Sequence, residues 1–139
     1  MKNQIIIAAL FFTFNCFAGM NTEDTSTSEQ PTAKTVIVIH GGAGWSPNTS
    51  DEIQDAIKAG LKTALDTGFS VLESGGSSLD AVEAAIVTLE DNPVFNAGRG
   101  SVYTAEEKQE MDASIMSGID QDAGAVASIS RVKNPIKLA

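Results

Sequence analysis

The stretch VIVIHGGAGW at residues 36–45 joins four consecutive β-branched residues to a loop that contains three glycines. A continuous β-branched run bounded by glycines is typical of a strand buried on both faces. Glycine carries no side chain and tolerates positive φ, so such a loop can bring backbone groups close to a ligand. The stretch therefore predicts a buried strand over residues 35–39 that delivers a backbone-lined loop at its end.

A second glycine-rich loop, NPVFNAGRG, spans residues 92–100. Because glycines interrupt this loop, its backbone carbonyl oxygens could surround a small cation, and such oxygens are the ligands that hard cations prefer. Each loop also has a purely structural interpretation when it is taken alone. The second can be the turn that ends a helix, and the first can be a tight strand exit with a core histidine at His40. Both interpretations stay open at this point.

Two helices are predicted between the loops. A cap formed by Thr49 with Glu52, or by Ser50 alone, begins the first helix, and apolar residues then recur at helical spacing to about Glu73. The pair Gly75-Gly76 ends it.

Ser77, with Asp80 three residues further on, begins the second helix, and Asn92-Pro93 stops it. Its apolar stripe is predicted at helical spacing. The stripe consists of Leu79, Val82, Ala85, Ile86 and Leu89.

After the second loop the pattern changes to short strands. Residues 102–104 predict a short strand, 105–109 a polar turn, and 111–116 and 124–130 two further strands. Asn134-Pro135 predicts a turn into another helix. The order is therefore one strand, two helices and then several strands.

Residues 1–18 predict a secretory signal peptide, with a positive charge at Lys2 and a short apolar segment. Residues 19–34 are polar and acidic and predict a disordered tether, so the folded part is expected over 35–139. The signal places the protein outside the cytoplasm, in the periplasm. Cys16 is the sole cysteine and lies inside the signal. A lipoprotein anchored through Cys16 is disfavoured because Asn15 precedes it.

Composition excludes several classes of function. The net charge is −9 without a basic cluster, which argues against nucleic acid and, after signal removal, against a membrane surface as partner. Neither glycine loop continues into Gly-Lys-Ser/Thr, and a dinucleotide fingerprint fails at Pro47 and at Tyr103. His40 is the single histidine, so a histidine-rich metal site is excluded.

Five motifs, taken together and in order, resemble the plant-type asparaginase and isoaspartyl peptidase family, which is related to the glycosylasparaginases. The resemblance covers about residues 35–139 and implies an α/β (α+β) fold, the αββα sandwich of N-terminal-nucleophile hydrolases, of which this sequence is the N-terminal portion. The motifs are VIHGGAG (38–44), LDAV (79–82), NPVFNAGRG (92–100), MDASIMSG (111–118) and AGAVA (123–127).

The resemblance also implies a mechanism. In that family a precursor cuts itself ahead of a threonine, and the freed threonine attacks a side-chain amide or β-aspartyl bond with its own α-amino group as base. No threonine of this sequence occupies the nucleophile's context, so we expect an incomplete α-subunit that is inactive alone. The family implies dimers of αβ units in which the remainder of the precursor is the partner. The substrate stays open among asparagine, isoaspartyl peptides and glycosylasparagine.

Site residues follow only from the resemblance. The active-site loop would be Gly41, Gly42, Ala43 and Gly44, with Asn96 nearby. No organic cofactor is expected. A structural sodium ion would be held by main-chain carbonyls, which here belong to Leu89, Glu90, Asn92, Phe95, Ala97 and Arg99.

Two alternatives come from other readings of the glycine loops. The first is a non-catalytic secreted domain that binds a small ligand or a cation through them. The second, weaker, is an esterase-like protein that uses His40-Gly41-Gly42 as an oxyanion loop, although no Gly-x-Ser-x-Gly elbow occurs. Asp112 is interpreted as a hydrogen-bonded buried acid, and Trp45 as a packing cap on the first loop.

Overall fold

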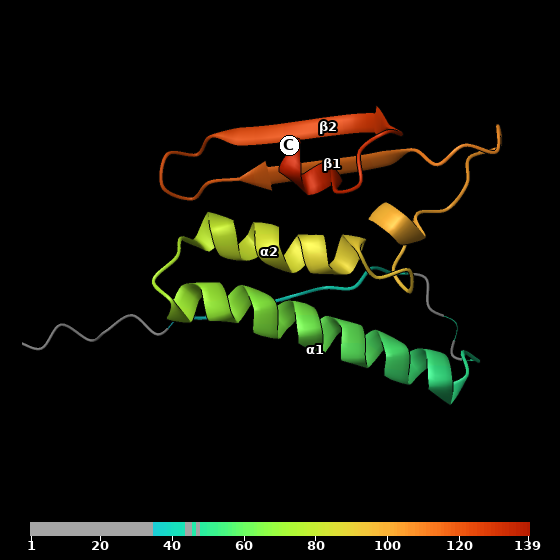
Figure 1. Cartoon of the computed structure of the whole chain (residues 1–139), viewed down its shortest axis with the longest axis horizontal. Helices are drawn as coiled ribbons and strands as arrows, with labels where there is room; N and C mark the ends of the chain where they lie inside the picture. Colours follow the sequence, from blue (N-terminus) through green and yellow to red (C-terminus); the bar gives the residue numbers. More distant parts are fainter. Residues whose placement is uncertain (1–34, 44–45, 47) are drawn as a thin grey trace, which may run out of the picture. The chain divides into compact units, whose positions relative to one another are not determined.

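The computed structural model describes residues 35–43, 46 and 48–139. The predicted signal peptide and tether, with Gly44, Trp45 and Pro47, lie outside these residues. In Figure 1, helix α2 lies between helix α1 and a β-hairpin, while residues 35–43 run beside the helix pair. In chain order the elements are α1 (Asp51–Glu73), α2 (Ser78–Glu90), the 3₁₀ turn η1 (Gly98–Gly100), β1 (Met111–Met116), β2 (Ala123–Ile129) and the 3₁₀ turn η2 (Pro135–Lys137).

Helix α1 begins and ends where the sequence predicts. Of the two possible caps, Ser50 is used, and its hydroxyl accepts from the Ile53 N–H at 3.5 Å. At the other end, Gly75 adopts φ +82° and the Gly76 N–H donates to the Val71 carbonyl at 2.9 Å. The left-handed residue after the helix lets the chain satisfy carbonyls that the helix leaves open.

Helix α2 opens with the predicted capping box. The Asp80 N–H donates to the Ser77 hydroxyl at 3.1 Å, and the Ser77 N–H donates to the Asp80 carboxylate at 3.2 Å. The predicted apolar stripe is partly wrong, because Leu79 and Val82 are exposed by 39% and 43%. Ala85 and Leu89 of the predicted stripe are buried, and the small side chains of Ala81 and Ala85 let α1 come close. The buried residues of α2 are Ala81, Ala85, Leu89 and Glu90.

The core is small and lies between α1, α2 and the second glycine loop. Ala64, Leu89 and Phe95 form its buried cluster. Half-buried aliphatic side chains surround the cluster, namely those of Ile39, Ile57, Leu61, Ile86 and Val94.

The predicted strand at residues 35–39 is wrong for this structure. These residues belong to no sheet, and the side chains of Val36 and Val38 are 69% and 85% exposed. Ile37 and Ile39 are half-buried, so only one face of the run is covered. A strand needs a neighbour for its backbone groups, and the two strands in the described part of the chain pair with each other.

Strands β1 and β2 form an antiparallel hairpin, which confirms the predictions for 111–116 and 124–130 to within a residue. A bulge interrupts the ladder between Met111 and Ala113. The predicted strand at 102–104 is wrong, because a single bridge between Tyr103 and Gln109 replaces it. The predicted helix after Asn134 is present as the short turn η2.

The observed mixture of helices and strands bears out the α+β class. In the part of the chain that the structure covers, no helix has the length and apolar character needed to cross a membrane.

Candidate functional site

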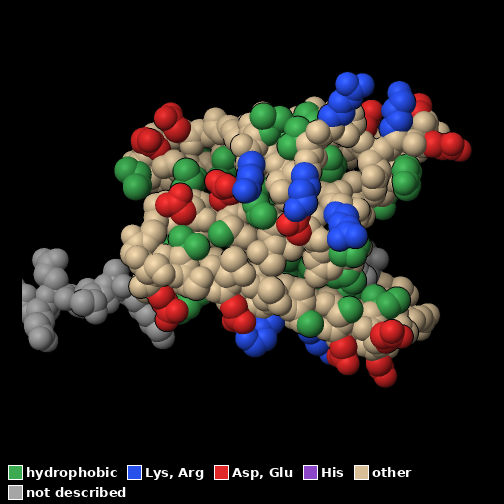
Figure 2. Space-filling model, in the orientation of Figure 1, with side chains coloured by type: hydrophobic (Ala, Val, Ile, Leu, Met, Phe, Trp, Pro, Cys, Tyr) green, Lys and Arg blue, Asp and Glu red, His purple; other side chains and the backbone are tan. Residues whose placement is uncertain are grey.

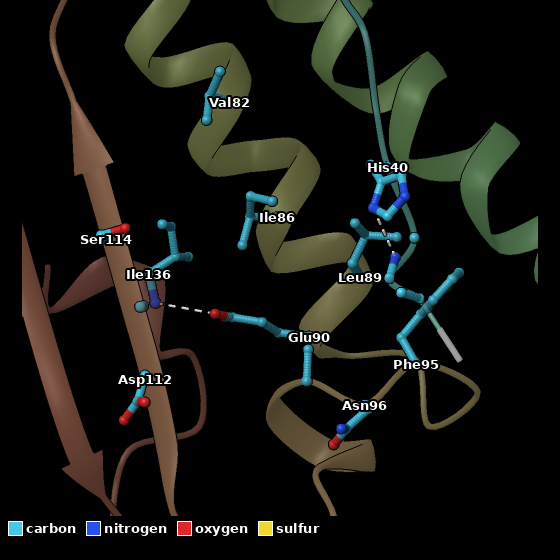
Figure 3. A pocket seen from close by; sticks show the side chains of 15 residues that line it. His40, Val82, Ile86, Leu89, Glu90, Phe95, Asn96, Asp112, Ser114 and Ile136 are labelled. Atoms are coloured by element: carbon cyan, nitrogen blue, oxygen red, sulfur yellow. Dashed lines mark hydrogen bonds between the residues drawn. The ribbon is translucent and has the colours of Figure 1, made fainter. Parts of the chain in front are cut away.

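One cavity of about 470 Å³ brings the two glycine-rich loops together (Figure 3). The first loop, the inner side of α2, the second loop, β1 and η2 each contribute to its wall. The lining consists of His40, Gly41, Gly42, Ala43, Val82, Ile86, Leu89, Glu90, Phe95, Asn96, Ala97, Asp112, Ala113, Ser114 and Ile136.

The first loop presents backbone to the cavity. Gly42 adopts φ +98°, and its N–H donates to Nδ1 of His40 at 3.2 Å. A side chain on Gly41 would press on Leu61 and Phe95, so a larger residue there would disturb the core. His40 itself is exposed, which overturns its interpretation as a core histidine. The ring turns back on its own loop and acts there as a hydrogen-bond acceptor.

The second loop is anchored by Phe95, whose side chain is 3% exposed. The next residue, Asn96, accepts from the Val102 N–H through its side-chain oxygen at 3.0 Å. That bond fixes the side chain by its oxygen and leaves the amide NH₂ as the donor that Asn96 can offer a ligand. The residues predicted for the active-site loop, as far as they are described, therefore border the same cavity.

Asp112 stands at the bulge of β1. Its carboxylate accepts from the Ser128 N–H at 2.8 Å, and Ser128 has φ +54°. The predicted hydrogen bond is confirmed, but the predicted burial is wrong because Asp112 is exposed. With Ser114, it puts polar groups on the sheet side of the cavity.

Glu90 is the buried acid of the site. Glu90 is 3% exposed. Its Oε1 accepts a hydrogen bond from the Ile136 N–H at 3.0 Å, which Figure 3 draws as a dashed line. Oε2 is buried and has no hydrogen-bond partner in the part of the chain described. Burial raises the pKa of Glu90, against the lowering effect of the hydrogen bond from the Ile136 N–H.

The sequence prediction named Glu90 only for its main-chain carbonyl and missed its side chain. The signal was present, because an acid at a helix C-terminus opposes the macrodipole and needs a partner elsewhere.

The carbonyls predicted to hold sodium follow one tightly wound segment. Those of Leu89, Asn92 and Ala97 accept backbone N–H groups from Asn92, Phe95 and Gly100 at 3.1, 3.2 and 3.0 Å, and that of Leu89 also faces the Asp91 N–H. A carbonyl has two lone pairs, so those of Asn92 and Ala97 each have one beyond the bond named here.

Glycine is also needed in this segment, since a Cβ on Gly98 would lie 2.5 Å from the Glu90 carbonyl oxygen. Within the described residues, no group of three His, Cys, Asp or Glu side chains could hold a metal.

Residues 33–139 match the model of the family described as asparaginase. The chain belongs to the asparaginase family. This asparaginase-family chain is 50% identical over 106 residues to an isoaspartyl peptidase/L-asparaginase of Xenopus laevis, covering 76% of this chain and 33% of the relative. It is 48% identical over 104 residues to the human protein of the same name, covering 75% and 33%. A plant-type L-asparaginase of Pyrococcus furiosus is 53% identical over 103 residues, with 74% and 33% covered.

These matches confirm the resemblance inferred from the five motifs. The asparaginase-family chain spans about a third of the length of the curated relatives it matches. Its cavity is lined by one hydroxyl side chain, that of Ser114, and by no threonine among the residues described.

Proposed function

We propose that this chain supplies the N-terminal part of an N-terminal-nucleophile hydrolase. The enzyme would cleave the side-chain amide of asparagine or the β-aspartyl bond of isoaspartyl peptides. The observation that carries the proposal is the convergence of the first loop and of Asn96 on one cavity. The relatives named isoaspartyl peptidase/L-asparaginase support this substrate class.

The cavity groups suit such chemistry. A threonine freed by self-cleavage would bring the nucleophile and, in its α-amino group, the base. Asn96 would offer its amide NH₂ to an oxygen of the substrate, and the backbone of Gly41 and Gly42 would let substrate come close without steric conflict. The αββα sandwich belongs to this proposal: the exposed run 35–39 would then gain strand neighbours.

The test uses the product of the longest reading frame that contains this sequence. We expect it to cut itself, to expose a new N-terminal threonine detectable by mass spectrometry, and to release ammonia from asparagine or aspartate from a β-aspartyl dipeptide. Replacing that threonine by alanine should abolish both cleavage and turnover. An uncut product without hydrolysis of either substrate would overturn the proposal. Comparing the two substrates also decides between them, and light scattering tests a dimer of αβ units.

We also propose that the carbonyls of residues 89–99 bind a structural sodium ion. Backbone carbonyl oxygens are ligands that hard cations accept, which supports the proposal. A bound ion stabilises the folded state by mass action, by about 2.7 kcal/mol at a hundred times its Kd. The melting temperature of the full-length protein should therefore be higher in NaCl than in choline chloride of equal ionic strength. Identical melting curves in the two salts would contradict sodium binding.

Export is a further proposal, supported by the pattern of residues 1–18. Expression with this segment should give a periplasmic protein whose mature mass begins at Gly19. Retention of residues 1–18 on a cytoplasmic product would refute export, and a lipid-modified Cys16 would instead establish a lipoprotein.

A further inference from the structure

Helix α2 carries acidic residues at its C-terminal end, where the helix dipole disfavours negative charge. Its last residue is Glu90, Asp91 follows, and the last turn holds no basic residue. The C-terminal end of a helix carries partial negative charge, so an acid there is electrostatically unfavourable. Two neighbouring carboxylates at this end therefore need compensation from another part of the chain.

The compensation comes from residues 133–136. The Ile136 N–H donates to Glu90 Oε1 at 3.0 Å, and the Asn134 amide donates to Asp91 Oδ1 at 3.1 Å. Lys133 pairs with Asp91 Oδ2 at 2.9 Å, but this ion pair is exposed and contributes little. The buried bond from Ile136 to Glu90 is therefore the strongest candidate for holding the two segments together.

On one side, Glu90 packs directly against the second loop. A Cβ at Gly98 would lie 2.5–2.8 Å from the carbonyl oxygen, Cβ and Cα of Glu90, so the loop lies directly on this residue. Any shift of Glu90 must move the segment that holds Asn96 and Ala97, which both line the cavity.

On the other side, the bond reaches the sheet. Asn134, Pro135 and Ile136 are all buried, and η2 packs against both β1 and α2. Ile136 itself lines the cavity beside Asp112 and Ser114. The Glu90 side chain thus connects the loop wall of the cavity to the sheet wall, as Figure 3 shows.

We propose that Glu90 is a positioning residue for the hydrolysis. By accepting from the Ile136 N–H it holds the second loop, with Asn96, at a fixed place relative to β1. This proposal rests on the proposed hydrolase function.

The test compares Glu90→Gln, Glu90→Ala and Glu83→Ala in the full-length protein. Gln keeps an oxygen for the Ile136 N–H, whereas Ala removes the acceptor. Glu83 lies on the same helix and has no hydrogen-bond partner in the part of the structure described, so Glu83→Ala is the matched control. Because small misplacements in an active site cost up to about 100-fold in rate, we expect Glu90→Ala to lower kcat by about 10- to 100-fold. Glu90→Gln should stay within about threefold of the parent, and Glu83→Ala should match it.

Two readouts separate positioning from a merely structural role. Leu65→Ala in α1 lies away from the cavity lining and supplies a destabilised reference. If Glu90→Ala loses no more kcat than this reference at equal folded fraction, or if Gln fails to rescue, the proposal is overturned. Hydrogen exchange at the Ile136 amide tests the bond without any activity, and it should quicken more in Glu90→Ala than in Leu65→Ala while staying unchanged in Glu90→Gln and Glu83→Ala. A full-length parent without hydrolysis would defeat the proposed function, while unchanged exchange at Ile136 would defeat this inference by itself.

Discussion

At the scale of single residues, Gly98 shows how tightly the second loop is built. The residue has φ +49°, a region that side chains disfavour, and it also lies against the backbone of Glu90. A side chain would therefore face conformational strain and a steric conflict with main-chain atoms that cannot rotate away.

We expect Gly98→Ala to lower the free energy of unfolding by about 2–4 kcal/mol, since strain and overpacking add. Two controls separate these causes. At Gly75 the backbone has positive φ but an added Cβ would have no neighbour within 4 Å, so Gly75→Ala should lower the free energy of unfolding by about 1–2 kcal/mol. At Gly118 there is neither positive φ nor a close neighbour, so Gly118→Ala should change it by less than about 0.5 kcal/mol. Urea denaturation of the full-length protein measures all three. Equal losses at positions 98 and 75 would show that the contact with Glu90 is unimportant.

The candidate site was predictable in part at this scale. The loops containing Gly41 and Asn96 are visible in the sequence because glycine patterns are local, and the structure places both on one cavity. The exposure of Asp112 and the burial of the Glu90 side chain depend on which segments pack together. The sequence shows that an acid stands at the end of α2, but it does not show which segment covers that acid.

At the scale of elements, the capping box of α2 gives a pH-dependent contribution. Hydrogen bonds from the Ser77 hydroxyl and N–H lower the pKa of Asp80. A carboxyl whose pKa is lower in the folded state binds fewer protons there than in the unfolded chain. Its stabilisation is therefore present above its unfolded pKa and is lost as the pH falls below about 4.

We expect Asp80→Asn to destabilise the protein at pH 7 and to differ less from the parent at pH 3. Ser77→Ala removes the cap itself and should cost about 1 kcal/mol. Glu106→Gln, at an exposed position outside the helices, provides a control for the loss of one carboxylate. Urea midpoints at the two pH values measure the effect, and a constant difference for Asp80→Asn would refute it.

Gly68 explains why α1 and α2 approach so closely. A Cβ at this position would lie 2.7 Å from Cδ1 of Ile37 and 2.9 Å from the Ala81 carbonyl oxygen. Glycine in a helix interior normally costs about 1 kcal/mol relative to alanine. Here the close contact must offset that cost.

We therefore expect Gly68→Ala to destabilise the protein by about 1–2 kcal/mol, because overpacking exceeds the gain in helix propensity. Ala59→Gly, at an exposed position of α1, should cost about 1 kcal/mol from propensity alone. Thermal melts of both variants test the sign. A higher melting temperature for Gly68→Ala would show that the helices can separate at little cost.

Elements were predictable where their signals are local. Ser50, Ser77 and Gly75 mark helix ends through bonds within a few residues, so both helices begin and end as predicted. The run 35–39 was not predictable in the same way. Its residues favour a strand, but a strand exists only when another edge pairs with it.

At the scale of the whole molecule, the buried core is small compared with the apolar side chains that stay exposed to solvent. Figure 2 shows hydrophobic side chains at the surface over the hairpin and along the helices. Large apolar side chains gathered at a surface are typical of an interface with another segment. The most exposed large apolar residues are Val36, Val38, Val102, Tyr103, Met116 and Ile119.

We expect residues 35–139 produced alone to bind a hydrophobic dye, to associate and to melt without a sharp transition. The product of the longer reading frame should instead melt cooperatively. Val38→Thr distinguishes the two situations, because the side chain is 85% exposed here and would be buried once strand neighbours are added. The substitution should improve the solubility of the isolated piece but cost the longer product about 1–3 kcal/mol, since a buried hydroxyl needs a partner. A soluble, cooperatively melting monomer of residues 35–139 would show that this part folds by itself, and would favour a non-catalytic binding domain over the hydrolase.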